Sequence, residues 1–245
     1  MINNYNSNQS SCYFLDIRNS TNIIRTISIG RRNHSRNSSS KKNDSQKLIR
    51  HSEFMLGIHK FLIEKLEKLG IAEFYFNNTG DGHVCLLWNK AHAWSVLDLA
   101  CSISDYLEKE IKEYYSTYLK FWEEEFKKDL SIGFGIGMHS GGSIVTEENI
   151  ANQRFAYGVV LNSAARTESF IKNFPGVSLL FTLNFKNRLK NQFKDLASPK
   201  LSTWAQYEKI ISEVTKFPVD TRDSKPSGHL LYTITKKNRT NFMTV

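Results

Sequence analysis

Residues 74–88 read Phe-Tyr-Phe-Asn-Asn-Thr-Gly-Asp-Gly-His-Val-Cys-Leu-Leu-Trp, and this stretch decides the fold. Two apolar runs, 74–76 and 83–88, flank a turn in which Gly80 and Gly82 enclose Asp81. Apolar runs separated by such a glycine-bearing turn are typical of a β-hairpin. We therefore expect two neighbouring strands with one carboxylate, that of Asp81, at their tip.

A strand and a helix are expected on each side of this hairpin. Residues 12–17 form an apolar, aromatic run typical of a buried strand, and apolar residues then recur at helical spacing over 54–69. After the hairpin, a helical stripe extends over 94–128, and 131–139 resembles a glycine-bearing strand. Further helices are expected at 162–171, 185–193 and 204–214, and further strands at 177–182 and 230–235.

The order strand, helix, hairpin, helix, strand is typical of an α/β (α+β) fold in which helices pack on an antiparallel or mixed sheet. We expect a single domain over residues 1–245. No apolar stretch is long enough to span a membrane and the start has no signal core, so a cytoplasmic protein is expected. Three cysteines, Cys12, Cys85 and Cys101, lie in apolar runs without CxxC spacing and are interpreted as core residues.

The net charge of +9 is concentrated near the N-terminus. Residues 1–50 hold nine Lys or Arg against two Asp or Glu, and a polar, basic loop is expected at about 30–46. We expect this loop to attract a small polyanion and do not expect a stable nucleic-acid complex.

Two carboxylates and one helical pair are candidates for chemistry. Asp16 lies near the end of the first strand and Asp81 at the hairpin tip, so the two could bind a divalent cation. The alternative is that Asp81 shapes the turn and Asp16 caps the next segment. Asn162 and Arg166 share a helix face at i and i+4, which suits phosphoryl transfer, although an ordinary surface pair would look the same.

Four segments, 14–21, 79–81, 135–141 and 158–166, together resemble the class III nucleotidyl cyclase catalytic domain. The resemblance implies a ferredoxin-like βαββαβ core that converts a nucleoside triphosphate to a 3′,5′-cyclic monophosphate and pyrophosphate. It implies that Asp16, Asp81 and the carbonyl of Ile17 hold two Mg²⁺ or Mn²⁺ ions. It also implies that Asn162 orients the ribose, that Arg166 stabilises the α-phosphate, and that both serve the site of a partner in a homodimer.

The base-reading positions depart from the purine-specific cyclases. Those enzymes place Lys or Glu where this chain has Asn77, and a small polar residue where it has Phe155. The aromatic ring of Phe155 would narrow the base pocket, and the Asn77 amide can both donate and accept hydrogen bonds. Such a pocket suits the edge of a pyrimidine better than that of a purine. The pattern resembles the pyrimidine cyclases of bacterial Pycsar antiphage systems, so UTP, or else CTP, is the expected substrate and cyclic UMP or cyclic CMP the signal to a separate effector. Thr21 and Lys225 are further substrate-binding candidates.

Two alternatives stay open on the sequence alone. One is an adenylate or guanylate cyclase with an atypical base pocket. The other is a catalytically silent nucleotide-binding module.

Overall fold

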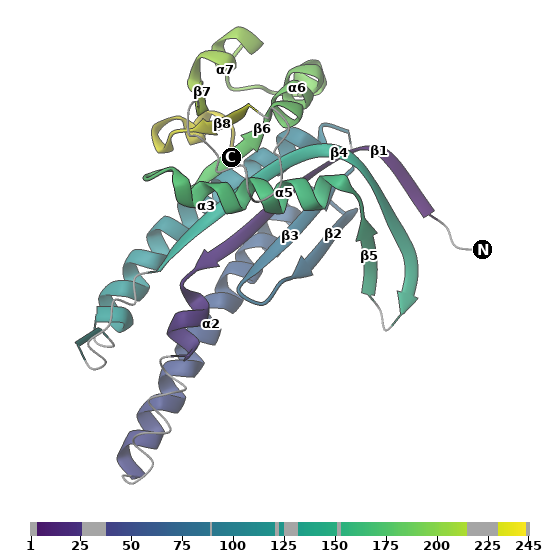
Figure 1. Cartoon of the computed structure of the whole chain (residues 1–245). Coiled ribbons are helices and arrows are strands. Elements are labelled where there is room, and N and C mark those ends of the chain that lie inside the picture. The colour runs from purple at the N-terminus through teal and green to yellow at the C-terminus, as the bar shows by residue number, and fades with distance from the viewer. Residues whose placement is uncertain are drawn as a thin grey trace, which may run out of the picture.

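The computed structural model describes residues 4–25, 38–88, 90–120, 123–124, 132–150, 153–214 and 230–243. Its centre is an eight-stranded sheet in the order β2-β3-β1-β4-β6-β8-β7, with β5 paired to β4 (Figure 1). Neighbouring strands are antiparallel except for the parallel pair β4 and β6. The strands are β1 (Asn4–Arg18), β2 (Phe74–Asn78), β3 (Gly82–Leu87), β4 (Gly133–Ile150), β5 (Gln153–Tyr157), β6 (Leu179–Thr182), β7 (Ile211–Val214) and β8 (Leu231–Ile234).

The predicted fold class is confirmed. The elements β1, α2 (Ser38–Lys68), β2, β3, α3 (His92–Tyr114) and β4 follow one another along the chain, which is the βαββαβ order of a ferredoxin-like core. The hairpin of β2 and β3 is present as predicted, and its turn spans residues 79–81.

Helices cover both faces of the sheet. Successive residues of a strand point to opposite faces, so Tyr13, Leu15 and Ile17 of β1 belong to the main core with α2 and α3. Cys12 belongs instead to a smaller apolar cluster with Val160 of α5 (Val159–Phe170). Helix α5 therefore lies on the face opposite α2 and α3 (Figure 1).

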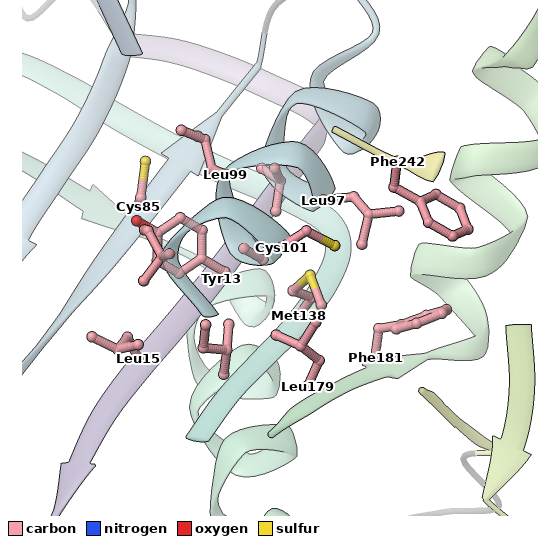
Figure 2. Close-up of a cluster of buried hydrophobic side chains, with 14 of the residues drawn as sticks. Tyr13, Leu15, Cys85, Leu97, Leu99, Cys101, Met138, Leu179, Phe181 and Phe242 are labelled. Carbon is pink, nitrogen blue, oxygen red and sulfur yellow. The ribbon is translucent and has the colours of Figure 1, made fainter. Parts of the chain in front are cut away.

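Helix α3 lies at the centre of the main core. Leu97 and Cys101 of this helix gather with Met138 of β4 and Leu179 of β6, and all four side chains are fully buried (Figure 2). A fully buried Leu contributes about 1.5–3 kcal/mol to folding, so this cluster is a main source of stability. The three cysteines are buried and free, which confirms their assignment to the core.

The predicted helix at 204–214 is wrong in its second half. Helix α7 (Trp204–Ile210) begins with a capping box formed by Thr203 and Gln206, but residues 211–214 form β7. This strand pairs with β8, and tertiary pairing of this kind overrides a local helical pattern. Strand β5 was not predicted. Helix α6 (Leu183–Gln192) lies close to its expected range of 185–193.

The predicted loop at 30–46 is wrong for residues 38–46, because α2 begins at Ser38. Extending a helix that is already anchored costs far less than nucleating one, so the packed part of α2 can continue through a polar segment. Residues 30–37 of the expected loop lie outside the described residues. The stripe expected over 94–128 is α3 followed by a π-helix, Tyr115–Leu119. No helix within the described ranges is long and apolar enough to cross a membrane.

Candidate functional site

The hairpin tip packs directly against the end of β1. Asp16 lies opposite Gly82 in the register of β1 and β3, and the backbone N–H of Ile17 donates to the carbonyl of Asp81 at 3.0 Å. A Cβ at Gly82 would lie 2.0 Å from the carbonyl oxygen of Leu15, so only glycine permits this approach. Backbone contacts thus place the two predicted aspartates on adjacent strand ends.

The charges of Asp16 and Asp81 interact. Burial raises the pKa of the half-buried Asp16 carboxyl, the nearby Asp81 carboxylate raises it further, and Arg18 opposes the rise. Two carboxylates that repel one another at the end of a sheet are a suitable donor set for Mg²⁺ or Mn²⁺, which prefer hard oxygen ligands. Their residue types and placement therefore fit the predicted cations. The side chain of Ile17 lies in the core, and a role for its carbonyl stays a prediction.

Two hydroxyl groups hold Asp81 in place. Ser20 Oγ donates to Asp81 Oδ2 at 2.6 Å, and Thr21 Oγ1 donates to the same oxygen at 3.2 Å. The chain reaches these positions through Asn19, whose φ of 65° begins the helical turn after β1. Thr21, predicted to bind substrate, thus contacts a predicted metal ligand, and Ser20 is a partner that the sequence analysis missed.

Helix α5 presents Asn162 and Arg166 to solvent. Residues two apart on a helix are about 200° apart around its axis, so these side chains lie opposite Val160, Ala164 and Glu168, which are buried. Val160 and Ala164 pack on the sheet face that carries Cys12. Asn162 and Arg166 therefore share a face, as predicted, but that face points away from the sheet and from the aspartates of the same chain.

Glu168 is a site residue that the sequence analysis missed. It is 8% exposed, and its pKa is raised to about 7, first by burial and then by the charge of Asp16, with Arg18 and Lys172 opposing. The sequence does carry one sign of it: Glu168 is an acidic residue four positions after Ala164, on the side of the helix that is otherwise apolar. A buried carboxylate with a strongly raised pKa, on the helix that carries the candidates Asn162 and Arg166, is itself a candidate for function.

The base-reading candidates lie on two strands that contact one another, β2 and β5. Asn77 is exposed on β2, two residues after the buried Tyr75, whose pKa is raised mainly by burial, an effect that the Asn77 side chain opposes. Phe155 is half-buried on β5, opposite Thr146. Lys225 lies outside the described residues.

Comparison with known proteins shows the fold. No protein-family profile matches the sequence, and no curated protein matches it. Among solved structures, the adenylyl cyclase CyaB from P. aeruginosa is similar over 95% of both chains, with 10% identity and a TM-score of 0.56. A guanylate cyclase domain from Catenaria anguillulae in complex with GTP is similar over 94% of this chain and 97% of its own, with 17% identity and a TM-score of 0.52.

A bacterial light-regulated adenylyl cyclase is similar over 96% of this chain but 53% of its own, with 13% identity and a TM-score of 0.59. This chain thus spans about half the length of that protein. At these identities the likeness establishes the fold, which is that of adenylyl and guanylyl cyclase domains.

Proposed function

We propose that this protein is a nucleotidyl cyclase that converts UTP, or else CTP, to the 3′,5′-cyclic monophosphate and pyrophosphate. The observation that carries the proposal is the pair Asp16 and Asp81, fixed by backbone contacts at the strand ends of a cyclase fold. The catalytic unit proposed is a single cytoplasmic domain. We further propose that the cyclic nucleotide is a second messenger in bacterial antiphage defence and that it acts on a separate effector.

Asp16, Asp81 and the carbonyl of Ile17 would hold two divalent cations, Mg²⁺ or Mn²⁺. These ions would lower the pKa of the ribose 3′-hydroxyl and neutralise charge on the phosphates. Ser20 and Thr21 support this role because their hydroxyl groups orient the Asp81 carboxylate. Thr21 is also proposed to contact the substrate directly.

The reaction forms one bond and breaks one. The 3′-oxygen bonds to the α-phosphorus in line with the leaving group, the bond from that phosphorus to the bridging β-phosphate oxygen breaks, and pyrophosphate departs. The hydroxyl proton is released. Arg166 would stabilise negative charge on the α-phosphate, and Asn162 would hold the ribose in an attacking position.

A homodimer with shared sites is proposed because Asn162 and Arg166 face away from the aspartates of their own chain. Three large apolar side chains on the neighbouring elements β4, β5 and α5 are exposed, namely Ile144 (42%), Tyr157 (60%) and Val159 (70%). Ile144 and Tyr157 are register partners, and Val159 begins α5. Exposed apolar side chains on these elements support a protein interface in this part of the molecule.

A pyrimidine preference is supported by Asn77 and Phe155. The exposed Asn77 amide can both donate and accept hydrogen bonds, which suits the edge of a pyrimidine. Phe155 supplies an aromatic ring where a purine-specific pocket has a small polar group. Lys225 is proposed as a phosphate contact from the sequence alone.

A product assay tests the proposal. The protein is incubated with each of the four nucleoside triphosphates and Mn²⁺, and the products are identified by mass spectrometry, with Asp81→Asn protein as the control. We expect cyclic UMP, or else cyclic CMP, from the wild-type protein and none from the control. Consumption of ATP or GTP alone would favour the adenylate or guanylate cyclase alternative. Absence of every cyclic product would leave the silent nucleotide-binding module.

A further inference from the structure

Two charged side chains, the buried Glu168 and the half-buried Arg18, lie near Asp16, and the proposed reaction does not use them. Glu168 reaches this region from the sheet-facing side of α5, and Arg18 ends β1 two residues after Asp16. Arg18 Nη2 is buried and has no hydrogen-bond partner within the part of the chain that the structure describes. A buried guanidinium nitrogen without a partner is unfavourable, so a carboxylate nearby stabilises Arg18.

Both charged groups border the same space over Gly135. This glycine lies opposite Asp16 in the register of β1 and β4. A Cβ at Gly135 would lie 2.2 Å from Glu168 Oε1 and 3.0 Å from Arg18 Nη2. The absence of a side chain on Gly135 therefore opens the space into which both groups extend, directly beside Asp16.

The backbone of α5 fixes the position of Glu168. A Cβ at Gly137 would lie 2.1 Å from the backbone N of Glu168 and 2.3 Å from the carbonyl oxygen of Ala164. The helix thus rests on β4 at this point with no side chain between them. Because the helix backbone packs directly on β4, Glu168 has a well-defined position, and the longer Arg18 side chain is the more adjustable of the two.

Arg18 has two carboxylates within electrostatic reach. It lowers the pKa of both the Asp16 carboxyl and the Glu168 carboxyl, against the larger effect of burial on each. A guanidinium group paired with Asp16 would occupy the oxygens that a cation needs, because it binds carboxylates through several N–H groups at once. Pairing with Glu168 leaves Asp16 available.

We infer that Glu168 is a positioning residue that holds Arg18 over Gly135 and away from Asp16, which keeps the Asp16 carboxylate free to bind a divalent cation. The inference rests on the proposed function, because that proposal assigns a cation to Asp16. Glu168 is not itself inferred to be a ligand, since the described residues contain no group of three acidic, His or Cys side chains arranged to hold one ion.

Binding of Mn²⁺ to nucleotide-free protein tests this inference, with free Mn²⁺ measured by electron paramagnetic resonance. The pH is set to about 8, where Glu168 is ionised. Glu168→Gln should weaken Mn²⁺ binding roughly 10-fold, the usual effect of losing a residue that positions a ligand. Adding Arg18→Met to that variant should restore most of the affinity, because the competitor for Asp16 is gone. Glu67→Gln, on the exposed side of α2, is the matched control.

The outcomes separate this inference from the proposed function. Unchanged affinity in Glu168→Gln, with affinity lost in Asp16→Ala, would overturn the inference and leave the proposed function standing. Equal losses with and without Arg18→Met would also overturn it, because Glu168 would then not act through Arg18. Equal affinity in wild type and Asp16→Ala would overturn the cation assignment itself. If Glu168→Gln does not fold, Arg18→Met alone decides: affinity at or above wild type supports the inference, and a loss overturns it.

Discussion

At the scale of single residues, the spacing between the two aspartates depends on Gly82. Its backbone contacts the carbonyl oxygen of Leu15 so closely that even a methyl group would force β3 away from β1. Asp81 precedes this glycine directly, and Asp16 lies opposite it. A small displacement here would therefore change the geometry of both carboxylates.

We expect Gly82→Ala to lower stability by about 1–3 kcal/mol, the usual cost of overpacking, and to reduce turnover more than its stability loss explains. Urea unfolding and the product assay measure the two effects. Gly142→Ala is the matched control, because a Cβ there has no neighbour within 4 Å and stability should change by less than about 0.5 kcal/mol. Equal stability of the two variants would contradict the contact at Gly82.

We expect Asp81→Asn to abolish turnover while the fold is retained. The amide still accepts hydrogen bonds from Ser20 and Thr21 but lacks the charge that a divalent cation needs. Asp81→Ala should in addition lose about 1 kcal/mol of stability for each hydrogen bond removed. Product formation, unfolding and light scattering measure activity, stability and assembly. Wild-type turnover in Asp81→Asn would refute the metal assignment.

The sequence predicted site residues whose signal is local and missed those that depend on packing. Asp81 stands out because it interrupts a hairpin, and Asn162 and Arg166 because their spacing defines a helix face. The contact of Ser20 with Asp81 joins positions 61 residues apart, and no local pattern reveals it. Glu168 leaves a weak signal on the apolar side of its helix, but its position near Asp16 depends on the packing of α5 on Gly137.

At the scale of elements, strands and helices with strong apolar periodicity were predicted, and those stabilised by partners were not. Residues 12–17 lie within β1, and residues 54–69 lie almost entirely within α2, because their apolar patterns match burial in the core. Strand β7 exists because β8 pairs with it, and β5 because β4 does. Such pairings have no counterpart in local periodicity.

Acid should destabilise the layer between the sheet and helices α2 and α3, where His83 and His92 are buried. Burial lowers their pKa to about 3 and about 4, against 6.5 in the unfolded chain. The unfolded chain therefore binds more protons in this range, so stability is present above about pH 6.5 and is lost as the pH falls toward 4. Each histidine accounts for about 2 kcal/mol between neutral pH and about pH 5.

The variant His92→Gln isolates one of these contributions. Glutamine can keep the hydrogen bond to Ser11 Oγ, which is 2.8 Å from His92 Nδ1, but does not titrate. Its unfolding free energy should fall about 2 kcal/mol less than that of the wild type between neutral pH and about pH 5. Parallel pH profiles of the two proteins would contradict the assignment. Glu168 has the opposite slope, because its raised pKa favours the folded state at low pH.

At the scale of the whole molecule, activity is expected to belong to the dimer. Each chain would give Asp16 and Asp81 to one site and Asn162 and Arg166 to the other, because the two sets face different directions. A monomer would hold two incomplete halves. Substitutions in different halves should therefore complement one another.

Mixing Asp16→Ala with Arg166→Ala protein should restore about a quarter of wild-type activity. Random exchange makes half of the dimers mixed, and each mixed dimer has one complete site of two. Product formation is measured after subunit exchange, which light scattering and native mass spectrometry verify. The control mixes Asp16→Ala with the double variant Asp16→Ala/Arg166→Ala, which cannot form a complete site. Absence of recovery in the first mixture, with exchange verified, would contradict shared sites.

The outward direction of Asn162 and Arg166 also decides how defective copies behave genetically. A chain with Asp16→Ala, produced in equal amount with the wild type, still completes one site in each mixed dimer, so about half of the activity remains. A chain that carries both Asp16→Ala and Arg166→Ala spoils both sites of every mixed dimer, and about a quarter remains. The first allele only lowers the dose of enzyme, whereas the second is dominant-negative.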